Sequence, residues 1–166
     1  TTSPTILNSK TTDGTGLGTF TSSLTGLSAN TTYYVRAYAT NSVGTAYGLA
    51  ISVRTLSATI PTGVTTNTIS SITQTTATGG GNSTNDGGAT ITSKGVCWSN
   101  TTSSPTIANS KTVDGSGIGS FTSSLSGLTA NTTYYVRAYA TNSAGTSYGS
   151  VISFSTLPAT IPTGVT

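Results

Sequence analysis

Few side chains in this sequence could take part in acid–base or metal chemistry. The 166 residues contain no histidine, one cysteine and three acidic residues. Proton transfer and metal binding need several suitable groups close together, and a hydrolytic triad, a zinc site and a paired-carboxylate mechanism each lack members here. We therefore expect neither an enzyme nor a bound metal or cofactor. The four residues concerned are Cys97, Asp13, Asp86 and Asp114.

The segment DGSGIG, which begins at Asp114, has the glycine content of a phosphate-binding or calcium-binding loop. A phosphate loop would continue with Lys and Ser or Thr at the start of a helix, whereas the residues that follow predict a strand around Phe121. A calcium site gathers several carboxylates, and this loop supplies only one. The segment is therefore interpreted as a glycine-rich turn.

Tyrosine is the side chain best suited to surface contacts in this sequence. Tyr135 and Tyr139 share one face of a strand predicted over residues 134–141, and we expect them to face outward with Tyr148 nearby. A tyrosine ring can stack on a sugar or pack against another subunit, although ordinary cross-strand packing would also explain these residues. The candidate contact residues are Tyr135, Tyr139, Tyr148, Tyr34, Tyr38 and Tyr47.

The distribution of charge and of apolar residues excludes two classes of partner. Six cations are scattered along the chain with no two adjacent, although the net charge is +3. Nucleic-acid binders cluster Lys and Arg to neutralise several phosphates together, so we expect no nucleic-acid partner. No apolar run approaches the roughly 18 residues of a spanning helix, so this segment is predicted to contain no membrane span.

The sequence repeats itself at an offset of 101 residues. Residues 1–65 match residues 102–166 at 50 of 65 positions without a gap, and TTYYVRAYATNS occurs twice unchanged. Mismatches such as Leu17 with Ile118 keep the apolar pattern, so both copies are expected to fold alike. A period of this length has the size of a whole domain and is too long for a solenoid unit.

The repeat sets the expected domain boundaries. Residues 57–157 make one complete β-sandwich repeat, residues 1–56 reproduce the C-terminal part of another, and residues 158–166 repeat the start of a third. One sheet face needs a second layer to bury it, so residues 1–56 alone could not close a core. We expect a longer polymer or a neighbouring chain to supply the missing strands.

Alternation of apolar and polar residues predicts short strands joined by turns rich in Asn, Asp and Gly. The clearest strand places Tyr134, Val136 and Ala138 on one face. The spacing of the strands predicts an all-β fold, a seven-stranded Greek-key β-sandwich, in which the small residues of 73–80 let the two sheets approach closely. The expected strands lie at or near residues 60–66, 73–80, 91–99, 111–113, 121–125, 134–141 and 148–156.

The segment LTANTTYYVRAYATNSAG, at residues 128–145 and nearly repeated at 27–44, resembles the fibronectin type III pattern. The resemblance implies that Tyr134 and Tyr33 are corner tyrosines whose hydroxyls bond to nearby backbone. The whole period is similar to the fibronectin type III-like and immunoglobulin-like tandem repeats of Bacteroidetes surface and secreted proteins. Trp98 departs from the family, whose tryptophan lies on the second strand. We expect Trp98 in the core, and Cys97 pointing either to the opposite face or inward.

These features together predict a structural protein. The resemblance implies an extracellular location, at the cell surface or secreted, and the repeats imply a fibre, stalk or adhesin that spaces and presents binding regions. Two alternatives stay open, namely a carbohydrate-binding or spacer module of a secreted enzyme and a subunit of a filament assembled by strand exchange. The expected partners are neighbouring repeats or copies of the chain, with surface glycans as the alternative.

Overall fold

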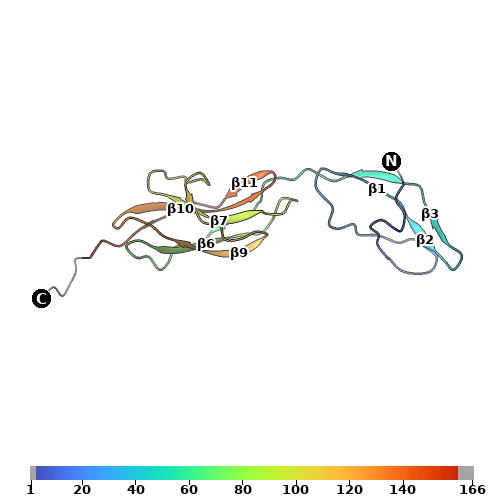
Figure 1. Cartoon of the computed structure of the whole chain (residues 1–166), viewed down its shortest axis with the longest axis horizontal. Helices are drawn as coiled ribbons and strands as arrows, with labels where there is room; N and C mark the ends of the chain where they lie inside the picture. Colours follow the sequence, from blue (N-terminus) through green and yellow to red (C-terminus); the bar gives the residue numbers. More distant parts are fainter. Residues whose placement is uncertain (1–2, 161–166) are drawn as a thin grey trace. The chain divides into compact units, whose positions relative to one another are not determined.

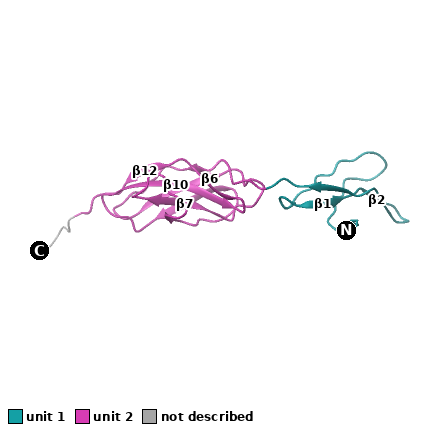
Figure 2. Cartoon of the chain, turned by 90° about the horizontal axis from the view of Figure 1, so that it is seen from above, with its two compact units in different colours: residues 1–57 teal, residues 58–166 magenta. Residues whose placement is uncertain are grey.

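The computed structural model describes residues 3–160, and all of their regular structure is β-strand. The chain divides into two compact units, residues 1–57 (unit 1) and 58–166 (unit 2), which are described separately (Figure 2). The predicted start of a further repeat at 158–166 lies mostly outside the described residues, which end at residue 160. Within the described part, no helix is long and apolar enough to cross a membrane.

The larger sheet of unit 2 is built around β10, which pairs with β7 on one side and with both β11 and β12 on the other (Figure 1). β8 extends this sheet beyond β7, and all the pairs are antiparallel. β11 and β12 act as one edge strand interrupted at residues 149–151, so the last predicted strand is found in two pieces. The members are β7 (Ser93–Ser99), β8 (Ser110–Lys111), β10 (Thr133–Asn142), β11 (Gly145–Tyr148) and β12 (Ile152–Ser155).

The smaller sheet of unit 2 has the strand order β5-β6-β9. In β6, a Cβ atom added at Gly81 would lie 2.6 Å from the Cβ of Ala138 and 2.9 Å from Cζ of Phe121. Only glycine permits this approach of the two sheets at Gly81, which lies just beyond residues 73–80, where the sequence placed the close approach. The members are β5 (Thr65–Thr66), β6 (Ala77–Ser83) and β9 (Gly119–Leu125).

The core of unit 2 lies between the two sheets and consists of alternate residues of the strands. On β10 the residues of this core are Tyr134, Val136 and Ala138, and on β9 they are Phe121 and Leu125. Burial of each large apolar side chain contributes about 1.5–3 kcal/mol, so this alternation holds the two layers together. The predicted all-β, antiparallel sandwich is thus confirmed. The other buried members are Ala77, Val96, Leu128 and Phe154.

The strand predicted at residues 73–80 begins later, at Ala77, because the preceding residues form a turn. The hydroxyl of Thr73 accepts hydrogen bonds from the backbone amides of Thr75 at 3.2 Å and Thr76 at 3.0 Å. Threonine side chains compete in this way with strand pairing. The strand predicted at 60–66 is likewise short, since only Thr65–Thr66 joins a ladder and Pro61 has no N–H to donate.

The chain enters and leaves unit 2 at opposite ends of the sandwich (Figure 1). At the entrance, the amide of Thr59 donates to the carbonyl of Gly87 at 2.9 Å, in the turn after β6. At the exit, the amide of Leu157 donates to the carbonyl of Thr73 at 3.0 Å, in the turn before β6. The length of β6 therefore separates the two ends.

Unit 1 has four strands that correspond to the last part of unit 2. β1 pairs with β4, and β2 pairs with β3. Residues 18–24 form no strand, although their counterparts form β9, because β9 pairs with β6 and no sequence similar to β6 occurs in residues 1–57. The four strands are β1 (Thr32–Val35), β2 (Tyr38–Thr40), β3 (Thr45–Tyr47) and β4 (Ile51–Arg54).

Candidate functional site

The corner tyrosines make the backbone hydrogen bond expected of them in both units. The hydroxyl of Tyr134 accepts a hydrogen bond from the amide of Thr129 at 2.9 Å, and that of Tyr33 accepts one from Ser28 at 2.8 Å. Tyr134 is buried and its ring stacks on Phe154 with a centroid distance of 5.8 Å. These two tyrosines therefore fix the approach to the central strand and leave little of the ring for a ligand.

An arginine and a tyrosine on the outer face of the larger sheet hold down residues 100–109 of unit 2. The guanidinium of Arg137 lies 4.0 Å from the ring centroid of Tyr148, and its Nε donates to the carbonyl of Pro105 at 2.5 Å. The hydroxyl of Tyr148 accepts from the amide of Ile107 at 3.2 Å. Both aromatic and charged groups thus stabilise the protein's own loop.

Unit 1 makes the same set of contacts. Arg36 lies 3.9 Å from the ring centroid of Tyr47 and donates through Nε to the carbonyl of Pro4. The hydroxyl of Tyr47 accepts from the amide of Ile6 at 3.2 Å. The outer face is therefore organised by local contacts that recur in both copies.

The prediction that Tyr139 faces solvent is wrong. Its side chain is only 1% exposed, and its hydroxyl donates to the carbonyl of Thr112 at 2.6 Å. Thr112 belongs to the loop that follows β8, and burial is the main reason why the pKa of the Tyr139 hydroxyl is raised. Tyr38 makes the equivalent bond to Thr11, also at 2.6 Å.

The other two candidate tyrosines are Tyr135 and Tyr34. Tyr135 is half-buried, and Tyr34 is 48% exposed. The predicted cluster of Tyr135, Tyr139 and Tyr148 therefore does not form one open aromatic surface. The alternation of residues along the strand gave the correct side of the sheet for Tyr139, but it could not reveal the loop above it.

Cys97 lies under the loop of residues 100–109. It points away from Val96 and the main core and is nevertheless fully buried, with Sγ 3.4 Å from the carbonyl oxygen of Pro105. Burial raises the pKa of this thiol, with a smaller opposite effect from Arg137. Trp98, on the other face of β7, is half-buried and packs against the main core.

Two of the three acidic residues, Asp114 and Asp13, accept hydrogen bonds from neighbouring hydroxyl groups. Asp114 accepts hydrogen bonds from Thr112 at 2.6 Å and Ser123 at 2.5 Å. Asp13 accepts from the equivalent Ser22 at 2.5 Å and Thr11 at 2.7 Å, and these bonds lower its pKa, Ser22 having the larger effect. Within residues 3–160 no three His, Cys, Asp or Glu side chains gather into a group that could hold a metal ion.

A buried lysine also serves the fold. Lys94 on β7 is 6% exposed, and its Nζ donates to the backbone carbonyls of Ile118 at 3.3 Å and Gly119 at 3.1 Å. The cation lies 5.8 Å from the ring centroid of Phe121. These contacts offset the desolvation cost of the buried ammonium group and anchor the start of β9.

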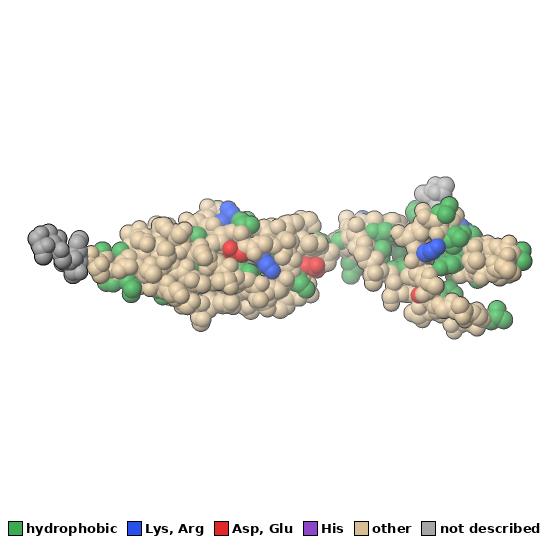
Figure 3. Space-filling view, turned by 60° about the horizontal axis from the view of Figure 1, so that its bottom comes forward, with side chains coloured by type: hydrophobic (Ala, Val, Ile, Leu, Met, Phe, Trp, Pro, Cys, Tyr) green, Lys and Arg blue, Asp and Glu red, His purple; other side chains and the backbone are tan. Residues whose placement is uncertain are grey.

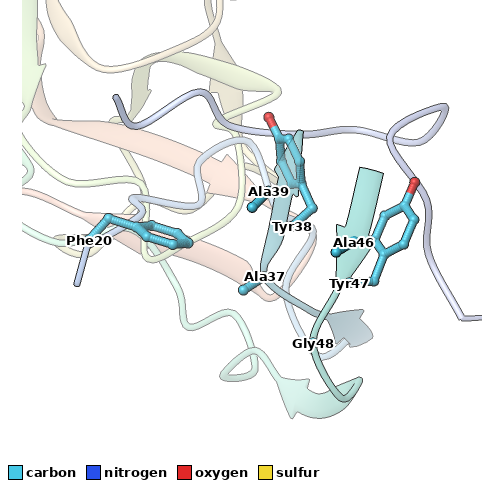
Figure 4. A pocket seen from close by; sticks show the side chains of 7 residues that line it. All are labelled: Phe20, Ala37, Tyr38, Ala39, Ala46, Tyr47 and Gly48. Atoms are coloured by element: carbon cyan, nitrogen blue, oxygen red, sulfur yellow. The ribbon is translucent and has the colours of Figure 1, made fainter. Parts of the chain in front are cut away.

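An apolar hollow of about 190 Å³ lies in unit 1 (Figure 4). Figure 4 shows Phe20, from the segment before β1, and side chains of β2 and β3 around this space. Sequence reasoning missed this site, although the repeat contained the signal: most of the residues around it match residues that build the sandwich of unit 2. The lining residues are Phe20, Ala37, Tyr38, Ala39, Ala46, Tyr47 and Gly48.

Comparisons with known proteins give matches in structure only. No protein-family model and no curated protein matches the chain. Domains d3–d4 of the rat CD45 extracellular region are similar at 15% identity and a TM-score of 0.51, over 90% of this chain and 76% of that chain. The FN1–FN3 domains of chicken CNTN1 match at 18% identity and a TM-score of 0.47, over 80% of this chain and 45% of theirs. The chain thus spans less than half the length of that structure.

A single fibronectin type III domain, from human KIAA0970 protein, matches at 12% identity and a TM-score of 0.42, over 62% of this chain and 79% of that chain. Identities this low concern the fold. The strand order of the two sheets, together with the tyrosine corner, defines the class of unit 2 as a fibronectin type III-like β-sandwich.

Proposed function

We propose that this chain is part of the structural repeat region of an extracellular fibre, stalk or adhesin, which spaces and presents binding regions away from the cell surface. The observation that carries the proposal is the recurrence of one contact set in both copies. Arg137, Tyr148 and Pro105 interact in unit 2 as Arg36, Tyr47 and Pro4 do in unit 1. The charged and aromatic side chains of the outer face thus stabilise the domain itself.

Near-identity between copies also favours a spacing role. The copies match at 50 of 65 positions, as expected when each module does the same work and length is what the repetition adds. The partners in this proposal are neighbouring repeats or copies of the chain, and no catalytic role is included. A fibronectin type III-like fold is common in extracellular proteins, which supports the proposed location.

The burial of Tyr139 weakens the carbohydrate-binding alternative. Tyr139 is buried, and the ring of Tyr148 is covered by Arg137, so Tyr135 alone would have to supply the stacking surface in unit 2. Sugar sites of this kind depend on several convergent groups. The structural role is therefore the better-supported proposal.

Two measurements test the proposed function. Small-angle scattering on arrays of one, two and three copies of residues 57–157 is expected to show a maximum dimension that grows by a constant increment for each copy. Antibodies raised against the chain are expected to label intact cells of the organism that makes it. A compact three-copy array, or labelling only after the cells are permeabilised, would contradict the proposal.

A further inference from the structure

Unit 1 exposes apolar side chains whose counterparts form the core of unit 2 (Figure 3). Phe20 is 54% exposed, whereas the matching Phe121 is 8% exposed. Leu24 is 45% exposed, whereas Leu125 is 1% exposed. Because the local sequences are nearly the same, the difference lies in what covers them. Leu27 and Val53 are also exposed, and their counterparts Leu128 and Phe154 are buried.

In unit 2, β6 contacts two of these side chains, Phe121 and Leu125, and β5 contacts the central strand β10. The backbone of β6 at Gly81 lies against Ala138 and Phe121, as the short distances from a Cβ added there demonstrate. From β5, the hydroxyl of Thr66 accepts a hydrogen bond from the amide of Ala138 at 3.0 Å and donates to the carbonyl of Ser150 at 2.7 Å. The cover is therefore both apolar and hydrogen-bonded.

Three of the residues that line the hollow of unit 1 are counterparts of residues that β5 and β6 contact. Phe20 corresponds to Phe121, Ala37 to Ala138, and Gly48 to Gly149. In unit 2 a Cβ atom added at Gly149 would lie 2.6 Å from the hydroxyl oxygen of Thr66, so β5 fills this position. The hollow therefore has the shape and chemistry of a place for strands β5 and β6.

Strands β1 and β2 of unit 1, which correspond to the central strand β10 of unit 2, also have a free edge. In unit 2, residues 135–141 of β10 pair with β7 over residues 93–99. The counterpart residues 34–40 pair only with β3 and β4, on the other side, in the described part of the chain. A free strand edge beside an apolar face favours the addition of a further strand by main-chain hydrogen bonds.

The rest of unit 1 already has the arrangement seen in unit 2. The Tyr33 hydroxyl bond, the Arg36 and Tyr47 contact and the Tyr38 bond to Thr11 are all present. A surface that is organised before binding loses less conformational freedom when its partner arrives. The open face is therefore an ordered acceptor surface.

We propose that this open face of unit 1 is a docking surface for a polypeptide segment with the sequence of residues 58–101, donated by a further copy of the repeat. The segment supplies β5 and β6 to the hollow and β7 to the free edge of residues 34–40. Its recognition features are the glycine backbone around Gly81, the Thr66 hydroxyl and the apolar side chain of Val96. The inference is independent of where the protein acts.

The test uses the full chain labelled with ¹⁵N and an unlabelled polypeptide of residues 58–101. Saturable one-to-one binding is expected, with shifts at the amides of Ala37 and Gly48 and hydrogen exchange of the amides in 34–40 slowed about tenfold or more. A segment carrying Val96→Asp is expected to bind at least about tenfold more weakly, because the carboxylate would be buried among apolar groups.

A matched pair of threonine variants tests the geometry. Thr66→Val in the segment removes the hydroxyl that would bond to the amide of Ala37, and about fivefold weaker binding is expected. Thr68→Val removes an exposed hydroxyl from the same connecting region and is expected to leave binding unchanged. Equal effects of the two variants would contradict the docking geometry.

A fusion covers the case in which the free segment is poorly soluble. Residues 58–101 are placed directly before Thr1, which reproduces the natural order at residues 101 and 102. Slow exchange of the amides in 34–40 is then expected, and a fusion carrying Val96→Asp in the added copy should lose it. The proposal is overturned if neither arm protects these amides or if Val96→Asp has no effect.

Discussion

Replacing Leu125 by alanine measures how much of the fold's stability depends on burial by the second sheet. Leu125 is 1% exposed, and its neighbour Gly79 on the adjacent strand β6 has no side chain to fill a cavity. Core Leu→Ala substitutions cost about 2–5 kcal/mol, and poor filling of the cavity places this one at about 3 kcal/mol or more. Leu24→Ala removes the same side chain from a 45% exposed position and is expected to cost less than about 1 kcal/mol.

Urea unfolding followed by Trp98 fluorescence provides the assay, because this single tryptophan packs against the core that contains Leu125. With a denaturant slope of about 1–3 kcal/mol per molar, the midpoint should fall by about 1–3 M for Leu125→Ala. The midpoint should be unchanged for Leu24→Ala, since Leu24 is absent from that core. A shift below about 0.3 M for Leu125→Ala, or equal shifts for both variants, would refute the reasoning.

Three further predictions concern single groups of unit 2. Tyr134→Phe removes the acceptor for the amide of Thr129 and should lower the free energy of unfolding by about 1 kcal/mol in the same urea assay. An unchanged free energy of unfolding would contradict the structural role of this corner tyrosine. The pKa of Tyr139 is raised in the folded state. Its contribution to the free energy of unfolding is therefore complete below the unfolded-state pKa of about 10 and is lost as the pH rises through the folded-state pKa. Stability should therefore fall above about pH 10, and Tyr139→Phe should weaken this fall, as pH-dependent unfolding would reveal. Cys97 is buried with a raised pKa, so a thiol reagent should modify it far more slowly in the native protein than in urea; equal rates would contradict its burial.

Local patterns in the sequence were sufficient to predict which residues enter the core. The alternation of Phe121, Ser123 and Leu125, and that of Tyr134 and Val136, matches the buried positions of β9 and β10. Side chains on a strand point alternately to opposite faces, so the pattern assigns a face from local information. The fold class follows from the number and spacing of such strands.

Tyr139 and residues 18–24 could not be predicted correctly because their state depends on distant parts of the chain. The outer face of β10 at Tyr139 is covered by a loop that follows another strand, and alternation alone treats that face as solvent. Residues 18–24 have nearly the sequence of β9 and still form no strand. A strand exists only with its hydrogen-bonding partner, which propensity does not specify.

The acceptor surface of unit 1 could have been found from sequence with one more step. Mapping the core of the complete repeat onto residues 1–56 would have marked Phe20, Leu24 and Ala37 as residues in need of a cover. The hydroxyl of Thr66 and the glycine backbone at Gly81 needed the structure, because both act through contacts between the two sheets.

The entry and exit of the chain at opposite ends of unit 2 determine how the module responds to tension. A force applied at residues 57 and 157 pulls the terminal strands β5 and β12 along their lengths. Hydrogen bonds between antiparallel strands lie perpendicular to the strand direction, so the bonds of β12 to β10 bear the force together and are not peeled apart one at a time. Mechanical unfolding of the module therefore requires several bonds to break at once.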